Sequence, residues 1–126
     1  MPQYLNYTVR VFTLTCALGA GAALCGCHGV PEHTLGVMAV NGPLLPMRAL
    51  ATTRAATPVV VQGEMIEKCP VAGCWFVLKD KSGVVRVDTK GAGFVVSDVP
   101  LHARLTVAGA VTGGAQPGIA ATGVRY

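Results

Sequence analysis

The chain has 126 residues, a length that fits one small domain with further segments at its ends. Hydrophobic residues make up 52% of the chain, charged residues 13%, and the formal net charge is +4. The Lys and Arg residues are scattered, and no run of four or more occurs. The sequence therefore lacks the basic cluster that marks a dedicated nucleic-acid-binding protein.

Residues 1–26 have the order of a secretory signal peptide. A short polar start with a single cation, Arg10, precedes an uncharged apolar stretch over 11–26 that ends in small residues. This stretch is shorter than the roughly 20 residues that a helix needs to span a bilayer. An extension to Val30 would just reach that length, so an uncleaved membrane anchor is the alternative interpretation.

The four residues 24–27, Leu-Cys-Gly-Cys, resemble a bacterial lipobox. The resemblance implies cleavage before Cys27, lipidation of Cys27 and tethering to a membrane through its acyl chains. Cys25 departs from the family pattern, which usually has Ala or Ser there. Each buried CH₂ group contributes about 0.8 kcal/mol, so two or three acyl chains hold a protein on a membrane. We therefore expect a lipid-anchored protein of the bacterial cell envelope that faces the periplasm; an ordinary signal peptide with incidental cysteines is the alternative.

Residues 27–57 are predicted to form a flexible tether that begins at the lipidated Cys27. They follow neither a helical nor a strand period, and Pro31, Pro43 and Pro46 interrupt them. His28 and His33 lie in this stretch and are interpreted as solvated residues rather than metal ligands.

Residues 58–126 have the pattern of an all-β domain. Five short strands are predicted over 59–69, 74–80, 84–88, 101–111 and 119–126, separated by turn signals. The glycine-rich connection 89–100 has room for one helical turn. Gly63 and Gly109 lie inside the first and fourth strands, as in a strongly coiled sheet that closes on itself. The predicted fold is a small five-stranded barrel.

The stretch 63–111 resembles the small exported OB-fold domains of unknown function that occur in bacterial lipoproteins and periplasmic proteins. The shared features are a glycine in the first strand (Gly63), the C-x4-C-W element of Cys69 to Trp75, an acidic-Gly turn over 80–83, and Phe94 before the fourth strand. The segments 107–111 and 121–124 continue the match. The resemblance implies an OB-type barrel over 58–126 and conveys little about biochemistry.

Cys69 and Cys74 are the two sulfurs that remain if Cys16 and Cys25 leave with the signal and Cys27 carries lipid. Across a four-residue hairpin loop, opposed Cβ atoms lie ~4.5–5.5 Å apart, close to the ~3.5–4.5 Å of a disulfide. An oxidising compartment favours a structural disulfide between them, worth about 2 kcal/mol. A redox-active pair, a thiolate metal site with His102 as a third ligand, and a reduced inert pair are the alternatives.

Trp75 is expected to fill the core or to cap one barrel end, because it is the largest side chain of its hairpin. No nucleophile has a base beside it in the sequence, so we predict neither an enzyme nor a cofactor or metal.

OB barrels bind ligands on the face around their second and third strands. The candidate ligand-binding residues there are Trp75, Phe76, Lys79, Lys81, Arg86 and Lys90. We predict a binding or assembly module for an anionic or saccharide ligand or an envelope protein, against the alternative of a solvated polar face. Nucleic acid is not an expected partner, because its binding needs exposed aromatic side chains on a basic groove. The predicted export signal also argues against a nucleic-acid partner. A nucleic-acid-binding OB protein and a thiol redox or metal protein remain the alternative functions.

Overall fold

The computed structural model describes residues 32–126, which form six strands and two short 3₁₀ helices. In chain order these are β1 (Thr34–Gly36), η1 (Met47–Thr52), β2 (Pro58–Lys68), β3 (Trp75–Lys79), β4 (Val84–Asp88), η2 (Lys90–Ala92), β5 (Arg104–Thr112) and β6 (Gly118–Arg125). The five predicted strands are present as β2 to β6, and η2 is the helical turn expected within 89–100. The fourth strand begins only at Arg104, because residues 100–103 form a turn with His102 at a φ of 70°.

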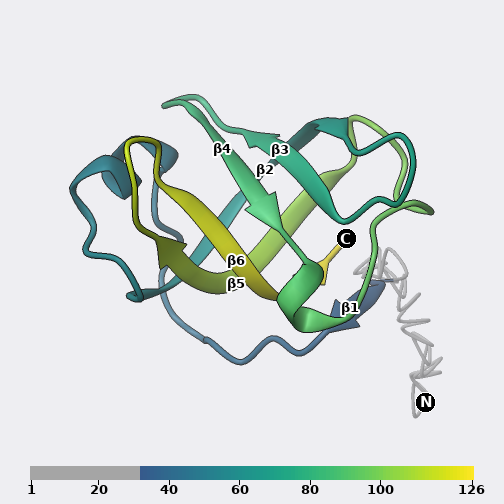
Figure 1. Cartoon of the computed structure of the whole chain (residues 1–126), viewed down its shortest axis with the longest axis horizontal. Helices are drawn as coiled ribbons and strands as arrows, with labels where there is room; N and C mark the ends of the chain where they lie inside the picture. Colours follow the sequence, from purple (N-terminus) through teal and green to yellow (C-terminus); the bar gives the residue numbers. More distant parts are fainter. Residues whose placement is uncertain (1–31) are drawn as a thin grey trace, which may run out of the picture.

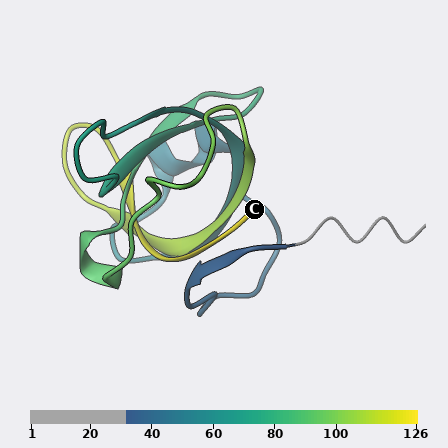
Figure 2. The same cartoon turned by 90° about the vertical axis from the view of Figure 1, so that its right-hand side faces the viewer.

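Strands β2 to β6 close into a barrel, which Figure 1 shows from the side and Figure 2 along its end. The order around the barrel is β6-β4-β3-β2-β5, and β5 pairs again with β6. Every pairing is antiparallel except that of β4 with β6. A closed barrel of five strands in this Greek-key order is the OB arrangement, so the predicted fold class is confirmed.

Strand β2 is long because it belongs to two strand pairs. Residues 58–64 pair with β5 and residues 64–68 pair with β3, with a register shift between Met65 and Glu67. A Cβ on Gly63 would lie 2.4 Å from the carbonyl oxygen of Lys79. Gly63 therefore stands where the bent strand brings another backbone too close for any side chain, as the sequence pattern indicated.

The barrel core is made by the alternate residues of the strands that point inward. In β3, Phe76 and Leu78 are fully buried, whereas Trp75 and Val77 lie on the outer face and are partly exposed. Phe76 is therefore a core residue rather than the predicted ligand contact. Of the two positions expected for Trp75, in the core or capping one barrel end, the core is wrong. The other fully buried large side chains in the described part of the chain are Met65, Leu105, Ile119, Val61, Val87, Val96, Val99, Val107, Val124 and Thr89.

The predicted flexible tether is wrong for β1 and η1, which are held on the barrel. Strand β1 pairs with β6, and Met47 and Leu50 of η1 are buried in the core. Leu44 also forms an isolated bridge to Val60 of β2. The predicted signal segment, Cys27 and the tether up to residue 31 lie outside the described residues. Within residues 32–126, no helix is long and apolar enough to cross a membrane.

Candidate functional site

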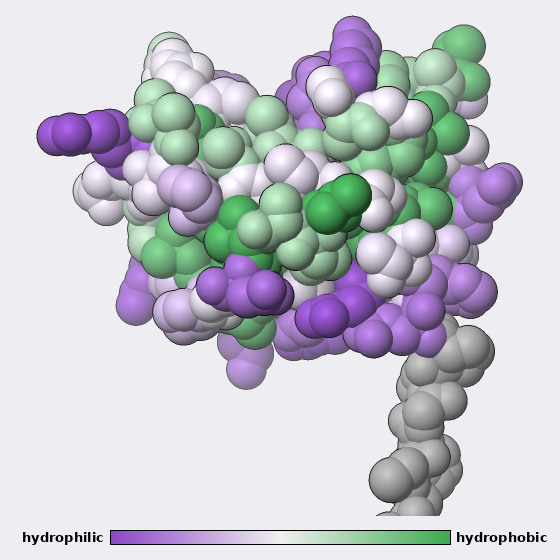
Figure 3. Space-filling view, turned by 90° about the horizontal axis from the view of Figure 1, so that it is seen from below, coloured by the Kyte–Doolittle hydropathy of each residue, from purple (hydrophilic) through white to green (hydrophobic). Residues whose placement is uncertain are grey.

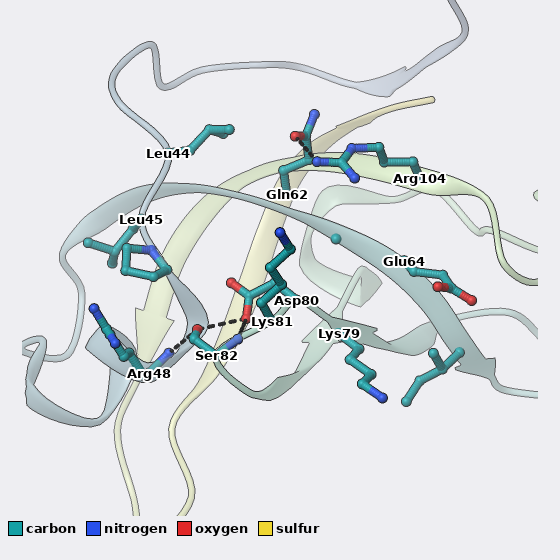
Figure 4. Close-up of a pocket in the computed structure, with 13 residues that line it drawn as sticks. Leu44, Leu45, Arg48, Gln62, Glu64, Lys79, Asp80, Lys81, Ser82 and Arg104 are labelled. Atoms are coloured by element: carbon teal, nitrogen blue, oxygen red, sulfur yellow. Dashed lines mark hydrogen bonds between the residues drawn. The ribbon is translucent and has the colours of Figure 1, made fainter.

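A groove of about 810 Å³ runs along the outside of β2 and β3, and we call it the β2–β3 groove (Figure 4). It lies between the segment that leads into η1, the middle of β2, the end of β3 and the turn that follows β3. Its lining residues are Leu44, Leu45, Pro46, Arg48, Gln62, Gly63, Glu64, Ile66, Lys79, Asp80, Lys81, Ser82 and Arg104.

Four cationic side chains surround this groove: Arg48 of η1, Lys79 at the end of β3, Lys81 in the turn and Arg104 at the start of β5. The guanidinium of Arg104 donates a hydrogen bond to Oε1 of Gln62 at 2.8 Å. None of the four forms an ion pair with a carboxylate in the part of the chain that the structure describes. The groove therefore offers positive charge that no described acidic residue neutralises directly.

Both carboxylates of the groove are already engaged. Oδ1 of Asp80 accepts hydrogen bonds from the backbone N–H and hydroxyl of Ser82 and from the N–H of Gly83, and Oδ2 accepts one from the N–H of Met47. Partial burial opposes ionisation of Asp80, but these hydrogen bonds outweigh it and lower the pKa of its carboxyl. Oε1 of Glu64 lies 2.6 Å from Nδ1 of His102.

The groove also has an apolar wall. Leu45 and Pro46 line it together with Leu44, which is 53% exposed, and Ile66, which is 36% exposed. Cations beside exposed aliphatic side chains suit a ligand that has an anionic group and a less polar body.

A second hollow of about 790 Å³ lies on the outer face of β3 and β4, bordered by η1 and the loop over 113–117. This is the region that OB barrels commonly use for ligands. Arg86, Val77 and Asp88 line it. The guanidinium of Arg86 also covers the ring of Trp75, at 4.6 Å from the centroid.

The six predicted ligand-binding residues do not form one site. Lys79 and Lys81 line the β2–β3 groove, and Arg86 lines the second hollow with Trp75 beside it. Lys90 is exposed on η2 and lines neither hollow.

Arg48 and Arg104 complete the cationic groove and were not among the predicted site residues. Arg48 lies in the stretch interpreted as a tether, so nothing in the sequence indicated that its backbone N–H would bond to Ser82 in the turn after β3. Arg104 reaches the groove because β2 pairs with β5 as well as with β3. Only the strand order could have revealed it.

Cys69 and Cys74 are free thiols rather than the predicted disulfide. The reason is the register of the hairpin. Lys68 pairs with Phe76, and the N–H of Cys69 donates to the carbonyl of Trp75, so Cys69 faces Trp75 and not Cys74. The peptide N–H groups of Ala72, Val71 and Gly73, together with the Cys74 side chain, lower the pKa of Cys69 to about 7.

The described residues bring no three His, Cys, Asp or Glu side chains together in a way that could hold a metal ion. His102, considered as a third ligand for the cysteine pair, contacts Glu64 instead. His33 stacks on the ring of Tyr126, with 5.1 Å between the centroids.

The chain is similar to the solved structure of the hypothetical protein YgiW from E. coli. The identity is 20% and the TM-score 0.53, and the match covers 66% of this chain and 88% of the YgiW chain. At this identity the likeness shows a shared barrel fold and nothing about ligands. No family model matches the sequence, and no curated protein does either.

Proposed function

We propose that this chain is a lipid-anchored protein of the bacterial cell envelope whose OB-type barrel binds an anionic ligand in the β2–β3 groove. The observation that carries the proposed ligand class is the imbalance of charge there. Four cations surround the groove, while its two carboxylates are engaged by Ser82, Gly83, Met47 and His102. The anchor is supported by the lipobox-like residues 24–27.

In this proposal the groove binds its ligand through the attraction between its cations and the anionic group of the ligand, and it does not catalyse a reaction. Lys79 and Lys81 supply mobile point charges, whereas Arg48 and Arg104 supply planar guanidinium groups that can hold a phosphate or carboxylate by two hydrogen bonds. The exposed side chains of Leu44 and Ile66 would contact the less polar part of the ligand. A hexose phosphate carries a phosphate anion on an uncharged body and is a suitable probe for the anionic part of the proposal.

The test is a calorimetric titration of the protein with glucose 6-phosphate, with glucose as the uncharged control. The double variant Arg48→Gln/Lys81→Gln removes two of the four cations. Since each partly exposed charge contributes about 0.2–1 kcal/mol, we expect roughly a tenfold loss of affinity. Lys90→Gln removes an exposed cation outside the groove and is the matched control. Equal binding of the double variant and the unaltered protein would refute the proposed site.

The anchor is tested separately by expressing the full chain in bacteria with radiolabelled palmitate. The proposal predicts label in the protein and its recovery with membranes, and loss of the label in the variant Cys27→Ser. Recovery of an unlabelled, released protein would contradict the anchor without affecting the groove.

A further inference from the structure

One end of the barrel carries most of the large hydrophobic side chains that are exposed in the described part of the chain. Seven such residues are exposed within 32–126, and four of them, Val37, Val71, Val95 and Leu101, belong to segments that meet at this end. The other three are Leu44, Ile66 and Val84.

Several contacts join these segments. The N–H of Val96 donates to the carbonyl of Gly73 at 2.9 Å, and Nζ of Lys68 donates to the carbonyls of Ser97 and Val99. A Cβ on Gly36 would lie 2.6 Å from the ring of Phe94, so β1 packs beside the same region.

The figures show the same grouping. In Figure 1 the loop 69–74, the stretch 94–103 and β1 all lie at the right-hand end of the molecule, and Figure 2 looks onto that end. Figure 3 shows hydrophobic side chains at the right-hand end of the underside, interspersed with hydrophilic ones.

The described chain also begins at this end and is fixed there. Oε1 of Glu32 lies 2.8 Å from Nε of Arg125. The backbones of His33 and Tyr126 exchange two hydrogen bonds of 2.7 and 2.9 Å, and their rings stack. Strand β1 then pairs with β6. The position of Glu32 is therefore tied to the barrel itself.

The distance from this fixed point to the proposed lipid is short. Five peptide units separate Cys27 from Glu32, and a fully extended chain covers at most about 3.3–3.6 Å per residue, or roughly 18 Å. The polar headgroup layer takes up about 5–7 Å of that span on one side of a bilayer. If Cys27 is acylated, Glu32 lies within roughly 11–13 Å of the headgroup surface.

We propose that this end of the barrel rests on the lipid bilayer, with Val37, Val71, Val95 and Leu101 as the side chains that contact it. The inference depends on the proposed lipidation of Cys27. An exposed aliphatic side chain that enters the headgroup–acyl boundary removes apolar surface from water, which is favourable. Lys79 and Lys81 lie at the opposite end of β3 from Trp75 and its neighbouring loop. The side of the β2–β3 groove formed by Lys79 and Lys81 therefore points away from the membrane, whereas Arg104, three residues after Leu101, lies nearer to it.

The test places a nitroxide on the acylated full chain in phosphatidylcholine vesicles. In a Cys69→Ser/Cys74→Ser background, single labels are attached through Val71→Cys or Leu101→Cys. Val84→Cys is the matched control, because Val84 is 60% exposed and lies at the other end of the β3–β4 hairpin. Circular dichroism confirms that each labelled variant is folded.

We expect collisions with an aqueous nickel chelate at positions 71 and 101 to be severalfold fewer in the acylated protein on vesicles than in the unacylated chain 28–126 in solution, which lacks Cys16, Cys25 and Cys27. Position 84 keeps its full accessibility. Positions 71 and 101 that stay as accessible as position 84 would overturn the inference. Protection that appears only in native membranes and not in pure lipid would also overturn it, in favour of a protein partner.

The intact mass of the vesicle-bound protein separates the two proposals. A mass without acyl chains refutes the lipid anchor, and the membrane-facing end falls with it. An acylated chain whose positions 71 and 101 remain open to the chelate refutes the membrane-facing end alone.

Discussion

The guanidinium carbon of Arg86 lies 4.6 Å from the centroid of the Trp75 ring, on the outer face of the barrel. The two residues come from neighbouring strands: Trp75 pairs with Asp88, and Arg86 pairs with Val77, so they meet diagonally across β3 and β4. This contact covers part of Trp75, the only tryptophan in the sequence. Trp75 lies on the outer face of β3 because its neighbour Phe76 points into the core.

Replacing Arg86 with Gln should remove this cation–π contact. A partly exposed contact of this kind is worth about 0.5–1 kcal/mol, so urea unfolding should show a loss of that size. The Trp75 fluorescence of the folded protein should change as well. Lys90→Gln should change neither quantity, and an unaltered unfolding curve for Arg86→Gln would contradict a stabilising contact.

Asp80 joins Met47, the first residue of η1, to the β3–β4 turn, so Asp80→Asn should destabilise the barrel by roughly 1–2 kcal/mol at pH 7. The folded-state pKa of Asp80 lies below its unfolded value. Its contribution is therefore complete above about pH 4 and is lost as the pH falls through the lower folded pKa. Denaturant unfolding from pH 7 to pH 2 should show the two proteins converging in acid.

Asp88→Asn is the control for that experiment, because its carboxylate accepts one exposed hydrogen bond, from the N–H of Lys90. A difference between the unaltered protein and Asp80→Asn that stays constant down to pH 2 would contradict the assigned hydrogen bonds.

Gly63→Ala should be among the most damaging small substitutions in the barrel. The new Cβ would meet the Lys79 carbonyl oxygen at 2.4 Å, and relief requires the β2 and β3 backbones to move apart. Overpacking of this kind costs about 1–3 kcal/mol. Gly91→Ala introduces a Cβ with no atom within 4 Å and should be nearly neutral in thermal unfolding. Equal melting temperatures for the two variants would show that β2 does not bend as described.

Cys69 should react with iodoacetamide faster than Cys74 at neutral pH, because its thiolate is stabilised by the surrounding peptide N–H groups. With a pKa of about 7, its alkylation rate should rise with pH to a plateau, with its midpoint near that value. Peptide mass mapping after short exposure identifies the modified residue. Preferential modification of Cys74, or a midpoint near that of an ordinary thiol, would contradict this environment.

The barrel could be predicted because its strands alternate and its turns carry Gly, Pro and Asp signals. The same patterns could not predict which of Phe76 and Trp75 points inward. Both are large aromatic residues in adjacent positions, and only the strand register decides which one faces the core. The same register explains why Cys69 and Cys74 do not face each other. The loop has one residue more than expected, so Cys69 lies opposite Trp75. Arg48 escaped prediction because η1 is held by Met47 and Leu50 in the core rather than by any periodic pattern of its own.

The most direct test of the account is a map of amide chemical shifts in ¹⁵N-labelled protein during titration with glucose 6-phosphate. The account predicts that the largest shifts occur at Lys79 to Ser82 and at Arg104, and that they weaken as salt is added; Arg48 lines both hollows and does not distinguish them. Shifts confined to Val77, Arg86 and the 113–117 loop would place anion binding in the second hollow instead. That result, or the absence of any shift, would contradict the β2–β3 groove as the ligand site.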